Sequence, residues 1–147
     1  MSTVAATRQL VVCALGAEEY GLPIEQVREI VRYETPRPVA SDLPWMRGVI
    51  GLRGRLIPVH DLAAWLGVTS PAGDPLAVAG GRNPISPAAK LVIVETAAEP
   101  VGLLVDDVVE VLTVEASQIE PVPSGSGEIV RLGARLVLLL DAGELGA

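Results

Sequence analysis

Short apolar runs, separated by polar or glycine-containing turns, dominate the chain. Residues 46–62 read MRGVIGLRGRLIPVHDL, in which a β-branched run breaks at Arg53-Gly54 and resumes at Leu56. This pattern predicts a tight hairpin between two buried strands, with a glycine available for a corner of positive φ. Further strands are expected at 9–15, 20–22, 90–95 and 101–105, each bounded by a polar turn.

Helical spacing is confined to short stretches. Apolar residues recur at helical intervals over 24–31, directly after a proline, which suits one or two helical turns. Residues 106–109 could form a shorter turn of the same kind. Asp61 is expected to cap a helix over 62–66, which Gly67 would end.

The chain also repeats itself. Residues 10–31 align without a gap onto 91–112, and eight of the 22 pairs are identical, including Gly21/Gly102 and Glu29/Glu110. A weaker match offset by 80 positions relates residues 52–57 to 132–137. The matched Gly and Glu positions favour duplication over a chance similarity of two aliphatic segments.

Duplication and short strands predict an all-β fold built as two small barrels or curled sheets with one or two short helices. We expect a single domain over 8–143, with lobe one at about 8–67, a joining loop at 68–89 and lobe two at about 90–143. A lobe of about 60–70 residues is marginal alone, so the lobes should share a core. The seam between them is a natural binding groove.

Composition narrows the functional classes. The 147 residues include no apolar run near the roughly 20 needed to span a bilayer. The first residues do not read as a signal peptide, and a single cysteine cannot form an internal disulfide. We therefore expect a cytoplasmic protein. A net charge of −7 argues against nucleic acid as a partner.

The sequence offers little convergent catalytic chemistry. His60 is the only histidine, and metal sites rarely rest on one imidazole. Asp106 and Asp107 are adjacent, so on a strand they would face opposite sides. Cys13 is expected to be a small core residue. The interpretation is a binding module without catalytic, metal-binding or cofactor-binding residues; the alternative is a small barrel enzyme or metal-binding protein that uses His60 and Asp61.

Several segments together resemble one known family. In order, they are EEYGLPIEQVREI, RGVIGLRGRLIPVHDL, VGLLVDDVVEVL, QIEP and RLGARLVLLLD. Their order and spacing resemble the CheW family over about Gln9 to Asp141. The resemblance implies two five-stranded SH3-like β-barrels around a shared core and a non-enzymatic role. It implies an adaptor that couples methyl-accepting chemoreceptors to a CheA-type histidine kinase, recruited to membrane-associated receptor arrays. The alternative is a CheW-like paralogue serving a kinase pathway for motility, pili or gene regulation.

The resemblance also implies two binding surfaces. Positions expected to contact the regulatory domain of the kinase are Val27, Glu29 and Arg53. Positions expected to face the cytoplasmic tip of the receptor are Gly48, Gly102, Val105 and Val108. The sequence departs from the family pattern at Gly51, where the family signature has asparagine.

The repeat separates scaffold from additions. Val27 and Glu29 have twins in the second copy, Val108 and Glu110, which favours a scaffold role; Arg55 and Asp61 recur in the same way. Arg53 has no charged twin, because Gly133 occupies its position, so a partner explains it better than the fold does. Trp45 and Met46 are also unmatched and form a possible interface, since both residue types are favoured there.

Overall fold

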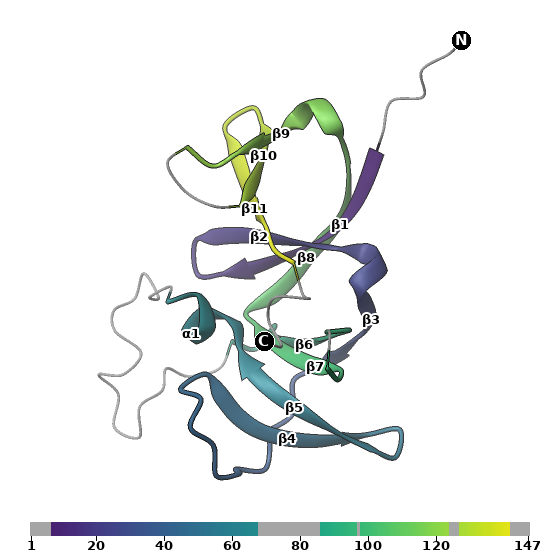
Figure 1. The fold of residues 1–147 in the computed structure, drawn as a ribbon, viewed down its shortest axis with the longest axis vertical. Coiled ribbons are helices and arrows are strands. Elements are labelled where there is room, and N and C mark those ends of the chain that lie inside the picture. The colour runs from purple at the N-terminus through teal and green to yellow at the C-terminus, as the bar shows by residue number, and fades with distance from the viewer. Residues whose placement is uncertain (1–6, 68–85, 97, 124–126, 142–147) are drawn as a thin grey trace.

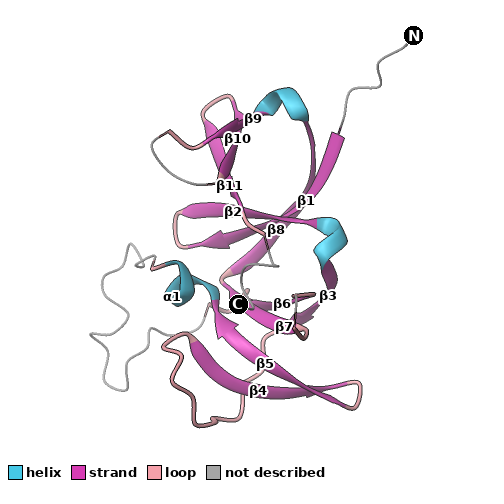
Figure 2. Cartoon of the chain, viewed as in Figure 1, coloured by secondary structure: helices cyan, strands magenta, loops and turns pink. Residues whose placement is uncertain are grey.

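The structure is a computed structural model that describes residues 7–67, 86–96, 98–123 and 127–141. The prediction of an all-β fold is confirmed, and strands make up most of the described chain (Figure 2). They are β1 (Thr7–Leu15), β2 (Glu18–Pro23), β3 (Val27–Arg32), β4 (Met46–Leu52), β5 (Arg55–Asp61), β6 (Lys90–Val94), β7 (Val101–Val105), β8 (Asp107–Glu115), β9 (Ile119–Pro121), β10 (Glu128–Leu132) and β11 (Arg135–Leu139).

The strands form two sheets, which lie at opposite ends of the molecule (Figure 1). One has six strands in the order β8-β1-β2-β11-β10-β9, and the other has five in the order β3-β6-β7-β5-β4. The family-derived expectation was five strands in each barrel, so the described strands exceed it by one in the first sheet.

The two copies of the repeat exchange strands. The six-stranded sheet combines β1 and β2 from the first copy with β8 to β11 from the second, and the five-stranded sheet combines β3 to β5 with β6 and β7. The expected lobe boundaries at 8–67 and 90–143 therefore do not coincide with the sheets. Linear order along the repeat gives no information on which copy a strand pairs with.

The register of the ladders between the copies is the same in both sheets. Cys13 lies opposite Val108 in the β1–β8 ladder, and their twins Val94 and Val27 lie opposite each other in the β6–β3 ladder. The parallel ladders match in the same way, since β5 pairs with β7 as β11 pairs with β2. This equivalence supports the duplication inferred from the sequence.

The helical turn expected after Pro23 is confirmed only at Ile24–Gln26, which form one turn of 3-10 helix, and β3 begins at Val27. The turn expected over 106–109 is wrong. In the second copy β8 begins at Asp107. The residues of β3 alternate between half-buried and exposed, and the strand pairs with β6. Tertiary pairing of β-branched residues therefore prevails over a spacing that also fitted a helix.

The short helix α1 (Leu62–Leu66) is confirmed at the expected place. The Asp61 carboxylate accepts a hydrogen bond from the Ala64 amide at 3.3 Å, and Gly67 ends the helix with φ of 72°. A side-chain cap at the start and a left-handed glycine at the end are the features that the sequence indicated. No described helix is long and apolar enough to cross a membrane.

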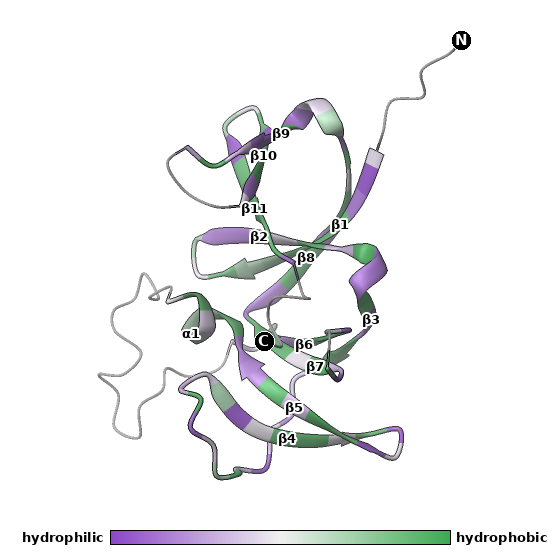
Figure 3. Cartoon of the chain, viewed as in Figure 1, coloured by the Kyte–Doolittle hydropathy of each residue, from purple (hydrophilic) through white to green (hydrophobic). Residues whose placement is uncertain are grey.

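Three clusters of buried residues form the interior. The largest lies between the sheets and takes residues from both copies, including Val11, Leu22, Val94 and Val105. The other two fill the five-stranded sheet around Val59 and Leu91, and the six-stranded sheet around Val12 and Val137. The shared core is thus as expected. Hydrophilic residues gather at the outer end of β1 and at the tip of the β4–β5 hairpin (Figure 3).

Gly48 meets a steric requirement in β4. Its φ is 137°, and a Cβ added there would lie 2.0 Å from the carbonyl oxygen of Arg37. Arg37 and Val49 exchange backbone hydrogen bonds of 2.8 and 2.9 Å, which hold the preceding loop against β4. The ladder between β4 and β5 shifts register beside Gly48. The backbone there therefore needs glycine for the fold itself.

We expect Gly48→Ala to lower the free energy of unfolding by about 3 kcal/mol, because it adds both backbone strain and a clash with backbone. Gly51→Ala is the matched control in the same strand, since an added Cβ at Gly51 meets nothing within 4 Å. Urea denaturation of both variants measures the difference. Equal stabilities would contradict the steric account of Gly48.

Candidate functional site

The tip of the β4–β5 hairpin holds a non-glycine residue in a left-handed conformation. Arg53 has φ of 51° and Gly54 has φ of 78°, the signs of a type I′ turn. In the twin hairpin between β10 and β11, the position of Arg53 is taken by Gly133, with φ of 62°. The backbone at this corner favours glycine. Arg53 therefore occupies a left-handed backbone conformation that glycine would adopt with less strain.

Arg53 forms a two-pronged ion pair with Glu29 of β3. Its Nε and Nη2 donate to the two carboxylate oxygens of Glu29 at 3.0 and 2.9 Å. β3 and the β4–β5 hairpin belong to opposite edges of the five-stranded sheet, so the pair closes that sheet toward a barrel. The hydrogen bond from Arg53 lowers the pKa of Glu29. The fold thus supplies Arg53 with a carboxylate, which the sequence analysis did not predict.

The six-stranded sheet contains an equivalent ion pair, in which the arginine comes from a different position of the repeat. Glu110, the twin of Glu29, accepts a contact of 2.7 Å from Arg135, the twin of Arg55. Arg135 also donates to both carboxylate oxygens of Glu19, at 2.7 and 3.3 Å. Arg135 therefore links three elements of the six-stranded sheet, β2, β8 and β11.

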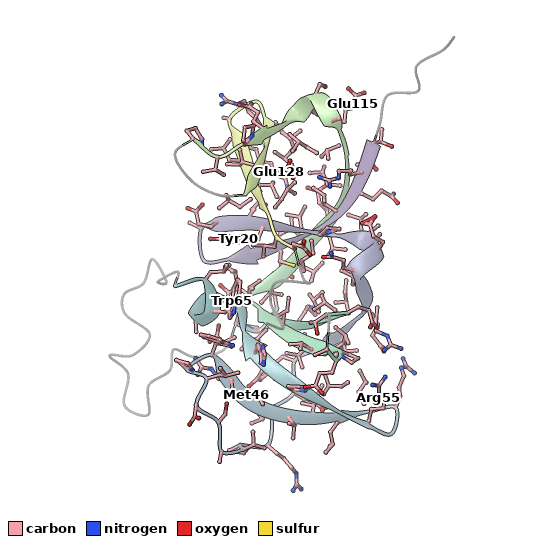
Figure 4. The ribbon with its side chains drawn as sticks, in the orientation of Figure 1. Tyr20, Met46, Arg55, Trp65, Glu115 and Glu128 are labelled. Carbon is pink, nitrogen blue, oxygen red and sulfur yellow. The ribbon has the colours of Figure 1, made fainter. Side chains whose placement is uncertain are left out.

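Arg55 is left without these partners. The twin of Glu19 in the other lobe is Pro100, and the carboxylate of Glu29 is engaged by Arg53. Arg55 is exposed, and within the described part of the chain it forms no ion pair. Figure 4 places it near the hairpin tip. The recurrence of Arg55 in its twin predicts a structural role, which the structure does not support, because within the described residues Arg55 forms no ion pair.

An exposed leucine lies next to Arg55. Leu56 is 75% exposed, the highest value among the large apolar residues described as exposed. Its neighbour across the strands is Gly51, which has no side chain to cover it. Ile57 and Val59 alternate with Leu56 and face the core. Arg55 and Leu56 are consecutive, so their side chains leave opposite faces of β5 at the hairpin tip. Within the described residues, the tip thus presents a cation without an ion pair and, on the other face, an uncovered apolar side chain.

The positions expected to face a receptor are largely covered. Val105 is fully buried, and Gly102 is buried where a Cβ would lie 3.3 Å from Cδ1 of Ile93. Val108, together with Val27 from the positions expected to contact the kinase, is half-buried and packs against the core between the sheets. Val105 belongs to the same core, whereas Gly102 faces Ile93 and Ile57 in the core of the five-stranded sheet.

Trp45 and Met46 are half-buried at the start of β4. Trp45 packs edge-on against Trp65 of α1, with ring centroids 6.4 Å apart. Figure 4 shows Trp65 on α1 and Met46 at the start of β4. Trp45 is therefore engaged in packing within the chain.

The alternative site at His60 and Asp61 is closed. His60 is 7% exposed, and its Nδ1 has no hydrogen-bond partner among the described atoms. Asp61 accepts 2.8 Å and 3.3 Å hydrogen bonds from Arg47 and from the Ala64 amide. Within the described residues, no group of three His, Cys, Asp or Glu side chains is placed to hold a metal. Burial raises the pKa of Cys13 to about 12, which leaves it a thiol.

Comparison with known proteins identifies relatives of similar length. The sequence model of the CheW-like domain family matches residues 9–147 of this chain. A probable chemotaxis protein CheW of Rhizobium etli is 37% identical over 91% of this chain and 79% of the relative, and the chemotaxis protein CheW of Rhizobium meliloti is 32% identical with the same coverage. The crystal structure of scaffolding protein TtCheW from Thermoanaerobacter tengcongensis superposes with a TM-score of 0.79 at 27% identity, covering 95% of this chain and 92% of that one.

We expect Arg53→Gly to raise the pKa of Glu29 toward 4.5, its ordinary value, because the hydrogen bond that favours the carboxylate is lost. A lowered pKa in the folded chain adds stability above that value, and the stability is lost as the pH falls. The variant should therefore lose less stability than the parent below pH 4.5. Titration of Glu29 by nuclear magnetic resonance measures the shift. Arg53→Ala is the control: it should melt below Arg53→Gly, because alanine keeps the left-handed backbone strained.

His60 should make the protein sensitive to mild acid. Burial lowers the pKa of His60 below 6.5, and only a weaker effect of Glu99 opposes it. The unfolded chain therefore takes up a proton first as the pH falls, and stability is lost below about pH 6.5. We expect His60→Leu, which copies the twin residue Leu140, to reduce the drop in melting temperature between about pH 8 and about pH 5. An unchanged drop would assign the acid sensitivity to other groups.

Proposed function

The chain belongs to the CheW-like domain family, and from this premise we propose that it is a non-enzymatic chemotaxis adaptor. It couples methyl-accepting chemoreceptors to a CheA-type histidine kinase within a signalling array. The observation that carries the proposal is the tip of the β4–β5 hairpin, where the uncovered Leu56 and the exposed Arg55 leave opposite faces of β5. Within the described residues Arg55 forms no ion pair.

The kinase contact is proposed at this hairpin. Leu56 offers apolar area, and Arg55 would pair with a carboxylate on the regulatory domain of the kinase. Arg53 uses its Nε and one Nη2 hydrogen on Glu29, so its remaining N–H groups stay available to a partner. The side chain of Arg53 is 74% exposed. Glu29 would hold the guanidinium in place and so reduce the ordering cost of binding.

The receptor contact is proposed at the seam between the two sheets. A helical hairpin at the receptor tip would lie against residues that rim the central core, among them Val108. Val105 is buried in the core between the sheets and would act by setting the shape of the seam. Gly102 is buried against Ile93 and would act by fixing the packing within the five-stranded sheet. Gly48 would act in the same indirect way, by fixing the loop that precedes β4.

The adaptor would transmit force through a rigid body. Each sheet contains strands of both copies, so the two copies cannot separate without breaking four ladders. A displacement imposed at the seam would then move the hairpin as well, with little deformation within the protein. No step of this mechanism requires a cofactor or a chemical reaction.

We expect Leu56→Ser and Arg55→Glu each to weaken binding to the regulatory domain of a CheA-type kinase from the same organism by roughly tenfold or more. Isothermal titration calorimetry measures the dissociation constants. Leu136→Ser is the control, since Leu136 is the twin of Leu56 in the other hairpin and is 50% exposed.

Two negative results would have different meanings, one for the proposed function and one for the proposed binding surface. If the parent protein forms no complex at concentrations of tens of micromolar, the adaptor proposal is contradicted. If the parent binds and all three variants bind equally well, the adaptor proposal stands and the surface is misassigned. A complex formed instead with a kinase of a motility, pilus or gene-regulation pathway would favour the paralogue alternative.

A further inference from the structure

Two cations lie directly opposite each other at the end of the five-stranded sheet. Arg32 of β3 and Lys90 of β6 are partners in the antiparallel ladder, and these strands adjoin in Figure 1. Like charges at opposed positions on neighbouring strands repel and destabilise the pair. The chain carries 18 acidic residues against 11 basic ones, so a like-charge pair of cations is unexpected from composition.

The other sheet serves as an internal comparison. The repeat offset of 81 relates Arg32 to Thr113 and Lys90 to Gln9. Gln9 and Thr113 are themselves partners in the β1–β8 ladder. The same ladder position therefore accepts a neutral pair. The two cations are an addition to this sheet and are not required by the fold.

The pair borders a cavity of about 370 Å³ that carries unused hydrogen-bond donors. Its lining residues are Arg32, Tyr33, Ser86, Pro87, Ala89 and Lys90. None of them is a carboxylate. Within the described chain Arg32 has no ion-pair partner, and the Lys90 ammonium donates one hydrogen bond, to the carbonyl of Ala88 at 2.8 Å. Two further ammonium hydrogens and the hydroxyl hydrogens of Tyr33 and Ser86 remain.

The wall of the cavity is already ordered. The turn from Ser86 to Ala89 is closed by a 3.0 Å hydrogen bond from the Ala89 amide to the Ser86 carbonyl. The Ala88 amide donates to the Ser86 hydroxyl oxygen at 3.1 Å, and the Tyr33 amide donates to the Ala89 carbonyl at 3.3 Å. The donors are thus held on backbone that a ligand would not need to rearrange.

We propose that this cavity binds a small phosphate-bearing anion, such as a diphosphate or a phosphomonoester. Two adjacent cations match the charge of a dianion, and the planar guanidinium of Arg32 can contact two oxygens of one phosphate. A net charge of −7 repels long polyanions, which favours a small ligand over a nucleic acid. The proposal stands independently of the adaptor function, because the docking hairpin and the seam contribute no residue to the cavity.

The test is calorimetric titration of the full-length protein with inorganic pyrophosphate at constant ionic strength. The variant is Arg32→Thr combined with Lys90→Gln, which installs the twin residues. We expect it to weaken binding by roughly tenfold or more, with a melting temperature in the absence of ligand no lower than that of the parent. Arg55→Gln removes an unpaired cation elsewhere on the same sheet and should leave the affinity unchanged.

Three results would overturn the proposal: no saturable binding to the parent, equal binding by the double variant, or equal weakening by Arg55→Gln, which would mark a diffuse charge effect. Succinate, a dicarboxylate, serves as the competitor of another class. If it binds as tightly as pyrophosphate, the ligand class is wrong. Kinase binding by the double variant should match that of the parent, which keeps this test separate from the adaptor test.

Discussion

The structure depends on the pairing of strands between the two copies of the repeat. The antiparallel ladders β1–β8 and β3–β6 and the parallel ladders β5–β7 and β11–β2 all join one copy to the other. Neither sheet is complete from one copy, and the largest buried cluster draws on both. A unit of about half this length would bury too little surface to be stable. The exchange of strands thus converts two marginal units into one cooperative body.

A duplicated frame makes the differences between the copies informative. Some positions of the repeat have the same packing role in both copies. Gly21 and Gly102 are such a pair, because an added Cβ would lie 3.2 Å from Val137 and 3.3 Å from Ile93 respectively. Arg53 differs from its twin Gly133, which is the residue that the turn favours. Its side chain pairs with Glu29 of β3 within the fold, yet 74% of it stays exposed.

Local signals in the sequence predicted the local structure well. The hairpin, the capped helix after Asp61 and the repeat were all read from spacing and turn residues. The helical spacing over 24–31 holds only for the 3-10 turn at Ile24–Gln26, because the β-branched residues that follow fit either period until β6 supplies a ladder. The exchange of strands and the Arg53–Glu29 pair join residues far apart in the chain. No local pattern encodes such contacts, so Arg55 could not be identified as the unpaired cation.

One strand connects the two proposed contact regions. β5 begins at Arg55, beside the exposed Leu56, and ends at Asp61, where Val59 to Asp61 pair with Gly102 to Leu104 of β7. A receptor that alters packing at the seam would act on this parallel ladder first. Because β5 is continuous and its core-facing residues are close-packed, it can respond only by moving as a unit. The hairpin would then be reoriented relative to a bound kinase without any change in its own contacts, which is the behaviour that an adaptor without chemistry requires.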